Sequence, residues 1–124
     1  MSGQANPMGQ QGRAGQVEVR NIFPTPIAIF LVPDAERINT ALIERILERE
    51  KTTPSVHKSN WGGWQSPDDF DKWCGPEGEA VLGMARTIAG QMTADRAGTR
   101  MNLDWMMNAW ANVNRAGQGN EFHT

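Results

Sequence analysis

The chain has 124 residues, of which 39% are hydrophobic and 21% are charged, and its formal net charge is −2. This length is enough for one self-supporting domain, and the near-neutral charge lacks the excess of Lys and Arg that binding to nucleic acid requires. Because Cys74 is the single cysteine, an internal disulfide and a cysteine-based zinc site are both excluded, and we expect a cytoplasmic location.

The N-terminal residues are rich in Gly, Gln and Ala and contain no apolar block of the kind that forms a secretory signal. We expect residues 1–16 to be a disordered tail and residues 17–124 to form the domain. The most apolar run, residues 27–32, is far shorter than the roughly 20 residues that span a bilayer, so we expect no membrane partner.

Two regular elements are predicted in the first half of the chain. Residues 27–32, which follow Pro24 and Pro26, predict a strand buried on both faces. A helix is expected to begin after Asp34 as N-cap and to end before Pro54. Its apolar stripe is formed by Ile38, Leu42, Ile43, Ile46 and Leu47.

A second helix is predicted from about Pro76 to Asp95. Its apolar face contains Val81, Met84, Ala85, Ile88 and Met92. Gly83 and Gly90 weaken such a helix by roughly 1 kcal/mol each relative to Ala, so their presence indicates close packing at both positions.

The segment between the two predicted helices has no periodicity and holds three of the five tryptophans. We expect its aromatic side chains to fold back onto the domain. Trp61 and Trp64 flank two adjacent glycines, and this arrangement fits either a substrate entrance or a hydrophobic lid over the core. The acidic group Asp68, Asp69 and Asp71 fits a helix N-terminus better than a cation site.

Residues 101–114 alternate between apolar and polar side chains, which predicts a long, half-buried strand. Its polar face ends in Trp110, Asn112 and Asn114, uncharged side chains that suit the lining of a cleft. Asparagines at a strand end can instead hydrogen-bond the neighbouring backbone, and that alternative stays open. One long strand and one short strand make an incomplete sheet.

Two motifs carry a resemblance to a known family. SNWGGWQS, residues 59–66, and WANVNRAGQGNEFHT, residues 110–124, are similar to motifs of bacterial and phage 2-oxoglutarate- and Fe(II)-dependent oxygenases. FPTPI, residues 23–27, resembles the opening strand of that family. The resemblance covers the chain from about residue 23 to its end.

The resemblance implies an α+β fold in which two helices pack on the first strands of an incomplete double-stranded β-helix, or jelly-roll. It implies that His123 is the first iron ligand and that Trp64, Trp110, Asn112 and Asn114 contact the substrate. In this family Fe(II) and 2-oxoglutarate act together to oxidise a C–H bond. The pattern continues with a further ligand directly after Thr124, so we expect the N-terminal part of an oxygenase, inactive by itself.

A second hypothesis remains beside the oxygenase. The chain could be a small, non-enzymatic binding module that uses its Trp-rich loop. His57 has no partner at metal-ligand spacing and is interpreted as a surface histidine. The substrate, a small molecule or a peptide, is not specified by the sequence. Since an incomplete sheet exposes an unpaired edge, we also expect edge-to-edge self-association.

Overall fold

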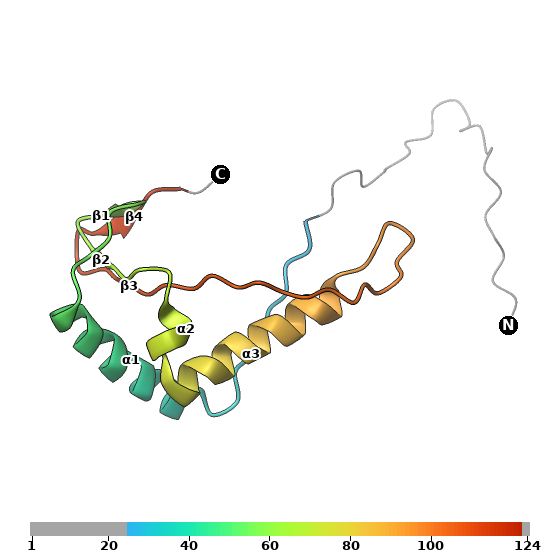
Figure 1. Cartoon of the computed structure of the whole chain (residues 1–124), viewed down its shortest axis with the longest axis horizontal. Coiled ribbons are helices and arrows are strands. Elements are labelled where there is room, and N and C mark those ends of the chain that lie inside the picture. Colours follow the sequence, from blue (N-terminus) through green and yellow to red (C-terminus); the bar gives the residue numbers. More distant parts are fainter. Residues whose placement is uncertain (1–24, 123–124) are drawn as a thin grey trace, which may run out of the picture.

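The structure is a computed structural model of the chain, and it describes residues 25–122. Two long helices pack against each other, and short strands gather near one end of the helical layer (Figure 1). The helices are α1, Ala35–Thr52, α2, Phe70–Trp73, and α3, Gly75–Met92. The strands are β1, Asn60–Trp61, β2, Trp64–Gln65, β3, Asn112–Val113, and β4, Gly119–Asn120.

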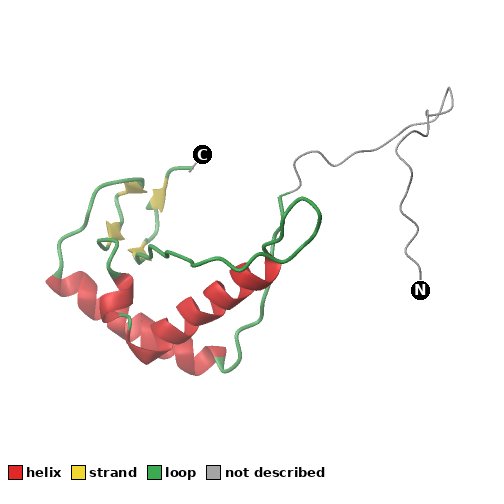
Figure 2. Ribbon diagram, turned by 45° about the vertical axis from the view of Figure 1, so that its right-hand side comes forward, coloured by secondary structure: helices red, strands yellow, loops and turns green. Residues whose placement is uncertain are grey.

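Within the described residues these strands form two small antiparallel sheets, β1 with β4 and β2 with β3. Figure 2 shows the strands beside one end of the helical layer. In the first sheet Asn60 is opposite Asn120, and in the second Gln65 is opposite Asn112. The predicted α+β class is therefore confirmed, whereas the described residues show no jelly-roll.

Helix α1 begins and ends close to the predicted positions, but its capping differs. Asp34 adopts the left-handed conformation with φ 56°, and its carboxylate makes no capping hydrogen bond. The carboxylate instead accepts from Arg37 Nε, one turn into the helix. The prediction of a side-chain N-cap was therefore wrong, since an ion pair with Arg37 takes the place of the cap.

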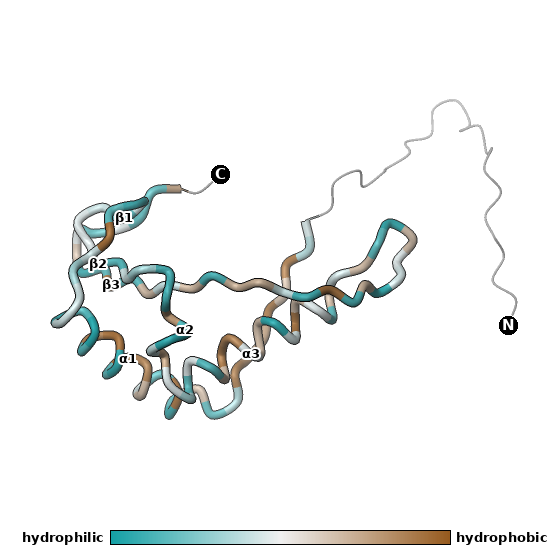
Figure 3. Tube along the Cα trace, viewed as in Figure 1, coloured by the Kyte–Doolittle hydropathy of each residue, from teal (hydrophilic) through white to brown (hydrophobic). Residues whose placement is uncertain are grey.

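The apolar stripe of α1 is only partly buried. Ile38 is 4% exposed, and Leu42 and Ile46 pack against the core, while Ile43 is 57% exposed. Along the helix, hydrophobic and hydrophilic positions alternate (Figure 3). The face of α1 that packs against the core is narrower than the predicted apolar stripe. Ile43 and Leu47 belong to the stripe but lie outside the packed face.

Helix α3 ends at Met92, three residues before the predicted end. Met84 and Ile88 are half-buried, whereas Met92 is 55% exposed. A Cβ added at Gly83 would meet no atom within 4 Å, so the close packing predicted there is wrong. A Cβ at Gly90 would lie 3.7 Å from the indole nitrogen of Trp105, which is an ordinary contact.

The core lies where α2, β2 and the C-terminal segment meet. Its buried cluster consists of Trp64, Phe70, Cys74 and Ala111. The rings of Phe70 and Trp73 contact edge to face, with centroids 4.9 Å apart. As predicted, Trp64 and Trp73 of the Trp-rich loop fold back onto the domain, but Trp61 is 70% exposed and does not. Burying large rings is a major source of stability in so small a core.

Two predicted strands are wrong in extent or in burial. Residues 27–32 form no strand, and Ile27, Ile29 and Leu31 are 81%, 90% and 88% exposed. Of residues 101–114, only Asn112–Val113 form a strand. A strand requires a hydrogen-bonded neighbour, and neither residues 27–32 nor residues 101–111 lie in a ladder within the described part of the chain.

Candidate functional site

The candidate site is built from the two motifs noted in the sequence, which pair with each other although about 50 residues separate them. Residues 59–66 supply β1 and β2, and residues 110–124 supply β3 and β4. Further backbone hydrogen bonds extend both pairings: Ser66 N donates to Ala111 O at 2.9 Å, and Glu121 N donates to Ser59 O at 2.8 Å. The two motifs therefore form one structural unit.

Glycine makes the close approach of the two motifs feasible. A Cβ on Gly63 would overlap the Asn114 side chain and would lie 2.9 Å from the carbonyl oxygen of Val113. Gly62 has a φ of +76°, a conformation that L-residues rarely adopt. The two adjacent glycines thus allow the turn between β1 and β2 to lie against β3.

The C-terminal motif alternates between a buried face and an exposed face, as its sequence predicts. Ala111 is 7% exposed and packs in the core with Val113, whereas Asn112 and Asn114 are exposed. Trp110 is 43% exposed and follows the same alternation. The expected polar face is therefore present at this end of the segment.

Asn120 of β4 joins the two predicted asparagines into one network. Asn114 Nδ2 donates to Asn120 Oδ1 at 2.8 Å, and Asn120 Nδ2 donates to Asn112 Oδ1 at 3.4 Å. We call these three residues the asparagine face. Sequence reasoning missed Asn120, because only the pairing of β4 with β1 brings it beside the other two.

Trp64 lies apart from the asparagine face. It is opposite Val113 in the β2–β3 ladder, and directly opposed residues of an antiparallel pair point to the same side of the sheet. Trp64 is 7% exposed, and its Nε1 donates to Thr53 O at 2.8 Å. The structure therefore brings Asn112 and Asn114 together and places Trp64 in the core.

His123, the predicted iron ligand, lies outside the described residues. Among residues 25–122 no group of three or more His, Cys, Asp or Glu side chains is placed to hold a metal ion. The described residues thus do not form an iron centre by themselves. His57 is exposed, Asp68 pairs with Lys58 at 2.9 Å, and Asp69 accepts from Trp73 Nε1 at 2.9 Å.

Cys74 is fully buried in the core, and burial is the main cause that raises the pKa of its thiol. Its neighbour Glu79 raises the pKa further. A thiol with a raised pKa is a poor nucleophile at neutral pH, so Cys74 is suited to packing.

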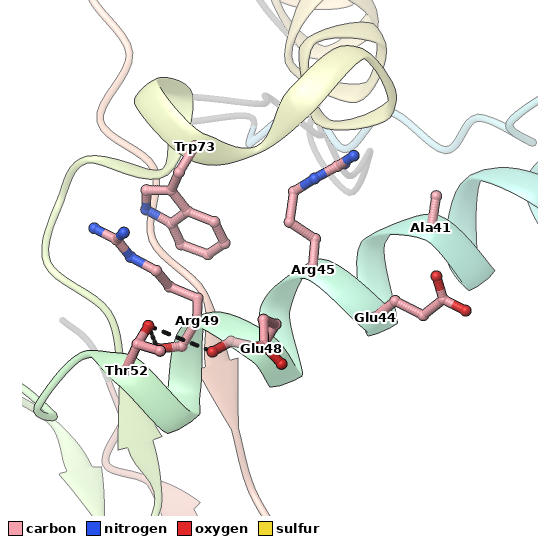
Figure 4. A pocket seen from close by; sticks show the side chains of 7 residues that line it. All are labelled: Ala41, Glu44, Arg45, Glu48, Arg49, Thr52 and Trp73. Atoms are coloured by element: carbon pink, nitrogen blue, oxygen red, sulfur yellow. Dashed lines mark hydrogen bonds between the residues drawn. The ribbon is translucent and has the colours of Figure 1, made fainter.

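A shallow groove lies between α1 and α2 (Figure 4). The Arg49 guanidinium lies over the Trp73 ring, 5.4 Å from its centroid, and 3.6 Å from Asp69. Arg45 donates to Glu77 at 3.0 Å and to the carbonyl oxygen of Cys74 at 2.7 Å. Both cations thus have partners within the fold. The groove is lined by Ala41, Glu44, Arg45, Glu48, Arg49, Thr52 and Trp73.

The chain matches no protein-family model, and no curated protein or solved structure is significantly similar to it. Among the described helices, none combines the length and the apolar character that crossing a bilayer demands.

Proposed function

We propose that the chain is the N-terminal part of a 2-oxoglutarate- and Fe(II)-dependent oxygenase of the hydroxylase type. The observation that carries the proposal is the pairing of the two motifs, β1 with β4 and β2 with β3. These are the segments that resemble the oxygenase family, and their pairing makes one unit that directly precedes His123 in the sequence. Fe(II) and 2-oxoglutarate supply the oxidising chemistry when they are bound.

In this proposal the residues of the chain have separate roles. His123 holds iron, and the asparagine face lines the substrate pocket, with Trp110 at its edge. The amides of Asn112, Asn114 and Asn120 both donate and accept, so together they orient a polar ligand without adding charge. Their mutual hydrogen bonds hold the side chains in place before a ligand arrives.

The two irregular segments around the helices, residues 27–32 and 101–111, are compatible with the jelly-roll that this proposal includes. Ile27, Ile29 and Leu31 expose large apolar side chains on a segment that has no regular secondary structure and no ladder partners in the described residues. Met106, at 94% exposed, does the same in the segment before β3. Further strands laid beside these segments would pair their backbone groups and bury these side chains.

The test is to express the complete reading frame that contains this chain and to measure succinate formed from 2-oxoglutarate with Fe(II). We expect turnover that His123→Ala abolishes. The matched control is His57→Ala, which removes an exposed imidazole and leaves turnover unchanged. A frame with no His or Asp directly after Thr124, or turnover that survives His123→Ala, would overturn the proposal.

A second candidate is the binding module that uses the Trp-rich loop, and one observation favours it. Trp61 is 70% exposed, in contrast to the buried Trp64 three residues later. Exposed tryptophans frequently anchor interfaces. In that case Trp61→Ala abolishes partner capture from an extract, whereas Fe(II) and 2-oxoglutarate have no effect.

A further inference from the structure

Gln65 of β2 combines burial with an unused hydrogen-bonding atom. The residue is 2% exposed, and its side-chain Oε1 has no hydrogen-bond partner within the described part of the chain. Buried polar atoms in folded proteins are nearly always paired, because leaving one unpaired costs folding free energy. An exception of this kind requires an explanation.

The neighbouring residue shows that polar groups in this region are otherwise satisfied. Ser66 is fully buried, yet its Oγ accepts from Ala111 N and donates to Pro67 O, both at 2.9 Å. The backbone of Gln65 is also satisfied: its N donates to Ser55 Oγ at 3.0 Å, and its O accepts from Val56 N at 2.9 Å. Among the described residues, two buried side-chain atoms have no hydrogen-bond partner: the Gln65 side-chain oxygen and, on α1, Arg49 Nε.

Strand register places this side chain on the same side of the sheet as the asparagine face. Gln65 is directly opposite Asn112 in the β2–β3 ladder, so both side chains point to one side. Trp64 and Val113 point to the other side, towards the core. Gln65 is therefore the buried member of a polar face whose exposed members are Asn112, Asn114 and Asn120.

We propose that Gln65 is a substrate-contacting residue of this site and that it accepts a hydrogen bond from an uncharged substrate. The substrate class is a molecule with an amide N–H or a hydroxyl group. The inference rests on the proposed function for the reaction that follows binding, but the binding itself requires neither iron nor 2-oxoglutarate.

The charge of the site favours a neutral ligand. Gln65 and the three asparagines carry no charge, and Arg115, the next residue after Asn114, is engaged by Glu50 at 2.6 and 2.9 Å. A carboxylate ligand offers acceptors alone and would face the Oε1 lone pairs without a proton between them. A hydroxyl or amide ligand supplies the missing proton.

The test uses acetamide and acetate, which share size and shape and differ in charge and in the N–H donor. Each is titrated into the isotope-labelled 124-residue chain while the side-chain amide signals of Gln65, Asn112, Asn114 and Asn120 are followed by NMR. We expect acetamide to produce a saturable shift of these signals and acetate to produce none. No saturable shift with acetamide, or equal shifts with both, would overturn the proposal.

Two variants separate a ligand-contacting role from a structural one. Gln65→Met keeps the side-chain length and removes the polar atoms, and Gln91→Met makes the same change at an exposed position of α3. We expect Gln65→Met to weaken acetamide binding, read from the asparagine signals, roughly three- to tenfold, and to leave Tm unchanged or raised by up to about 8 °C. Gln91→Met should change neither quantity.

A fall in Tm for Gln65→Met, or undiminished acetamide binding by that variant, would show that Gln65 is structural and would overturn the inference. The oxygenase proposal fails on different evidence, namely the absence of iron-dependent succinate formation by the complete reading frame. Acetamide binding that depends on Gln65 supports the inference whichever result the turnover assay gives.

Discussion

Gly63 lies so close to Asn114 that no side chain fits between them. A Cβ on Gly63 would overlap the Asn114 side chain and would approach the carbonyl oxygen of Val113 to 2.9 Å. The β1–β2 turn therefore contacts β3 through bare backbone, and Asn114 remains free to donate to Asn120 at 2.8 Å. This contact links the glycines of the first motif to the asparagine face of the second.

We expect Gly63→Ala to lower the free energy of unfolding by about 1–3 kcal/mol, because the Val113 carbonyl belongs to a paired strand and cannot move freely. Urea denaturation followed by tryptophan fluorescence measures the change. Gly83→Ala is the matched control: it meets no atom within 4 Å on α3 and should stabilise by roughly 0.5–1 kcal/mol. Equal effects of the two substitutions would contradict the close contact of Gly63 with Val113 and Asn114.

Trp64 and Trp61 should differ sharply in their contribution to stability. Trp64→Ala opens a cavity in the core cluster and leaves Thr53 O without its partner, so we expect a loss of about 3–5 kcal/mol. Trp61→Ala, at a 70% exposed position, should change stability by less than about 0.5 kcal/mol. Thermal unfolding of both variants checks this, and a larger loss for Trp61→Ala would reject the assignment of Trp64 to the core.

The Cys74 thiol should be unreactive in the folded chain, because it is buried and its pKa is raised chiefly by that burial. A chromogenic disulfide reagent should label it slowly under native conditions. The labelling rate should rise in step with unfolding as urea is added. Rapid labelling of the native chain at neutral pH would contradict its burial.

The contact between Glu50 and Arg115 should make stability depend on pH in the acid range. Hydrogen bonds from Arg115 are the main cause that lowers the pKa of the Glu50 carboxyl in the folded chain. A lowered folded-state pKa means that the stabilisation is complete above the unfolded-state pKa, about 4.3, and is lost as the pH falls through the folded-state value.

The measurement compares the wild-type chain with Glu50→Gln by urea denaturation at pH 7 and at pH 3. At pH 7 the wild-type chain should be more stable than Glu50→Gln. This difference in the free energy of unfolding should shrink at pH 3. Glu44→Gln, an exposed position on the same helix with no salt bridge among the described residues, is the control. A difference between wild type and Glu50→Gln that stays constant with pH would show that the Glu50 charge does not contribute.

The chain on its own should self-associate through its exposed apolar segment, residues 27–32. Ile29 and Leu31 are 90% and 88% exposed, and residues 27–32 lack a ladder partner in the described part of the chain. Sedimentation velocity should show species larger than the monomer that increase with protein concentration. The double variant Ile29→Lys, Leu31→Lys should reduce them. A wild-type chain that stays monomeric at high concentration would count against this prediction.

The sequence by itself determined the two long helices, the return of the Trp-rich loop to the core and the alternation of Ala111, Asn112 and Val113. Helical periodicity and strand alternation are local properties, and they depend on residues within a few positions of one another. The sequence also pointed to Asn112 and Asn114, because polar side chains on a half-buried strand occupy every second position.

The tertiary structure decided what depends on distant partners. It left residues 27–32 and most of residues 101–114 outside the ladders, since a strand forms only where a neighbour accepts its hydrogen bonds. It brought Asn120 beside Asn114, and it placed the side chains of Gln65 and Asn112 on the same side of the β2–β3 sheet. These relations arise from the register between two segments about 50 residues apart, and no local pattern in the sequence carries that register.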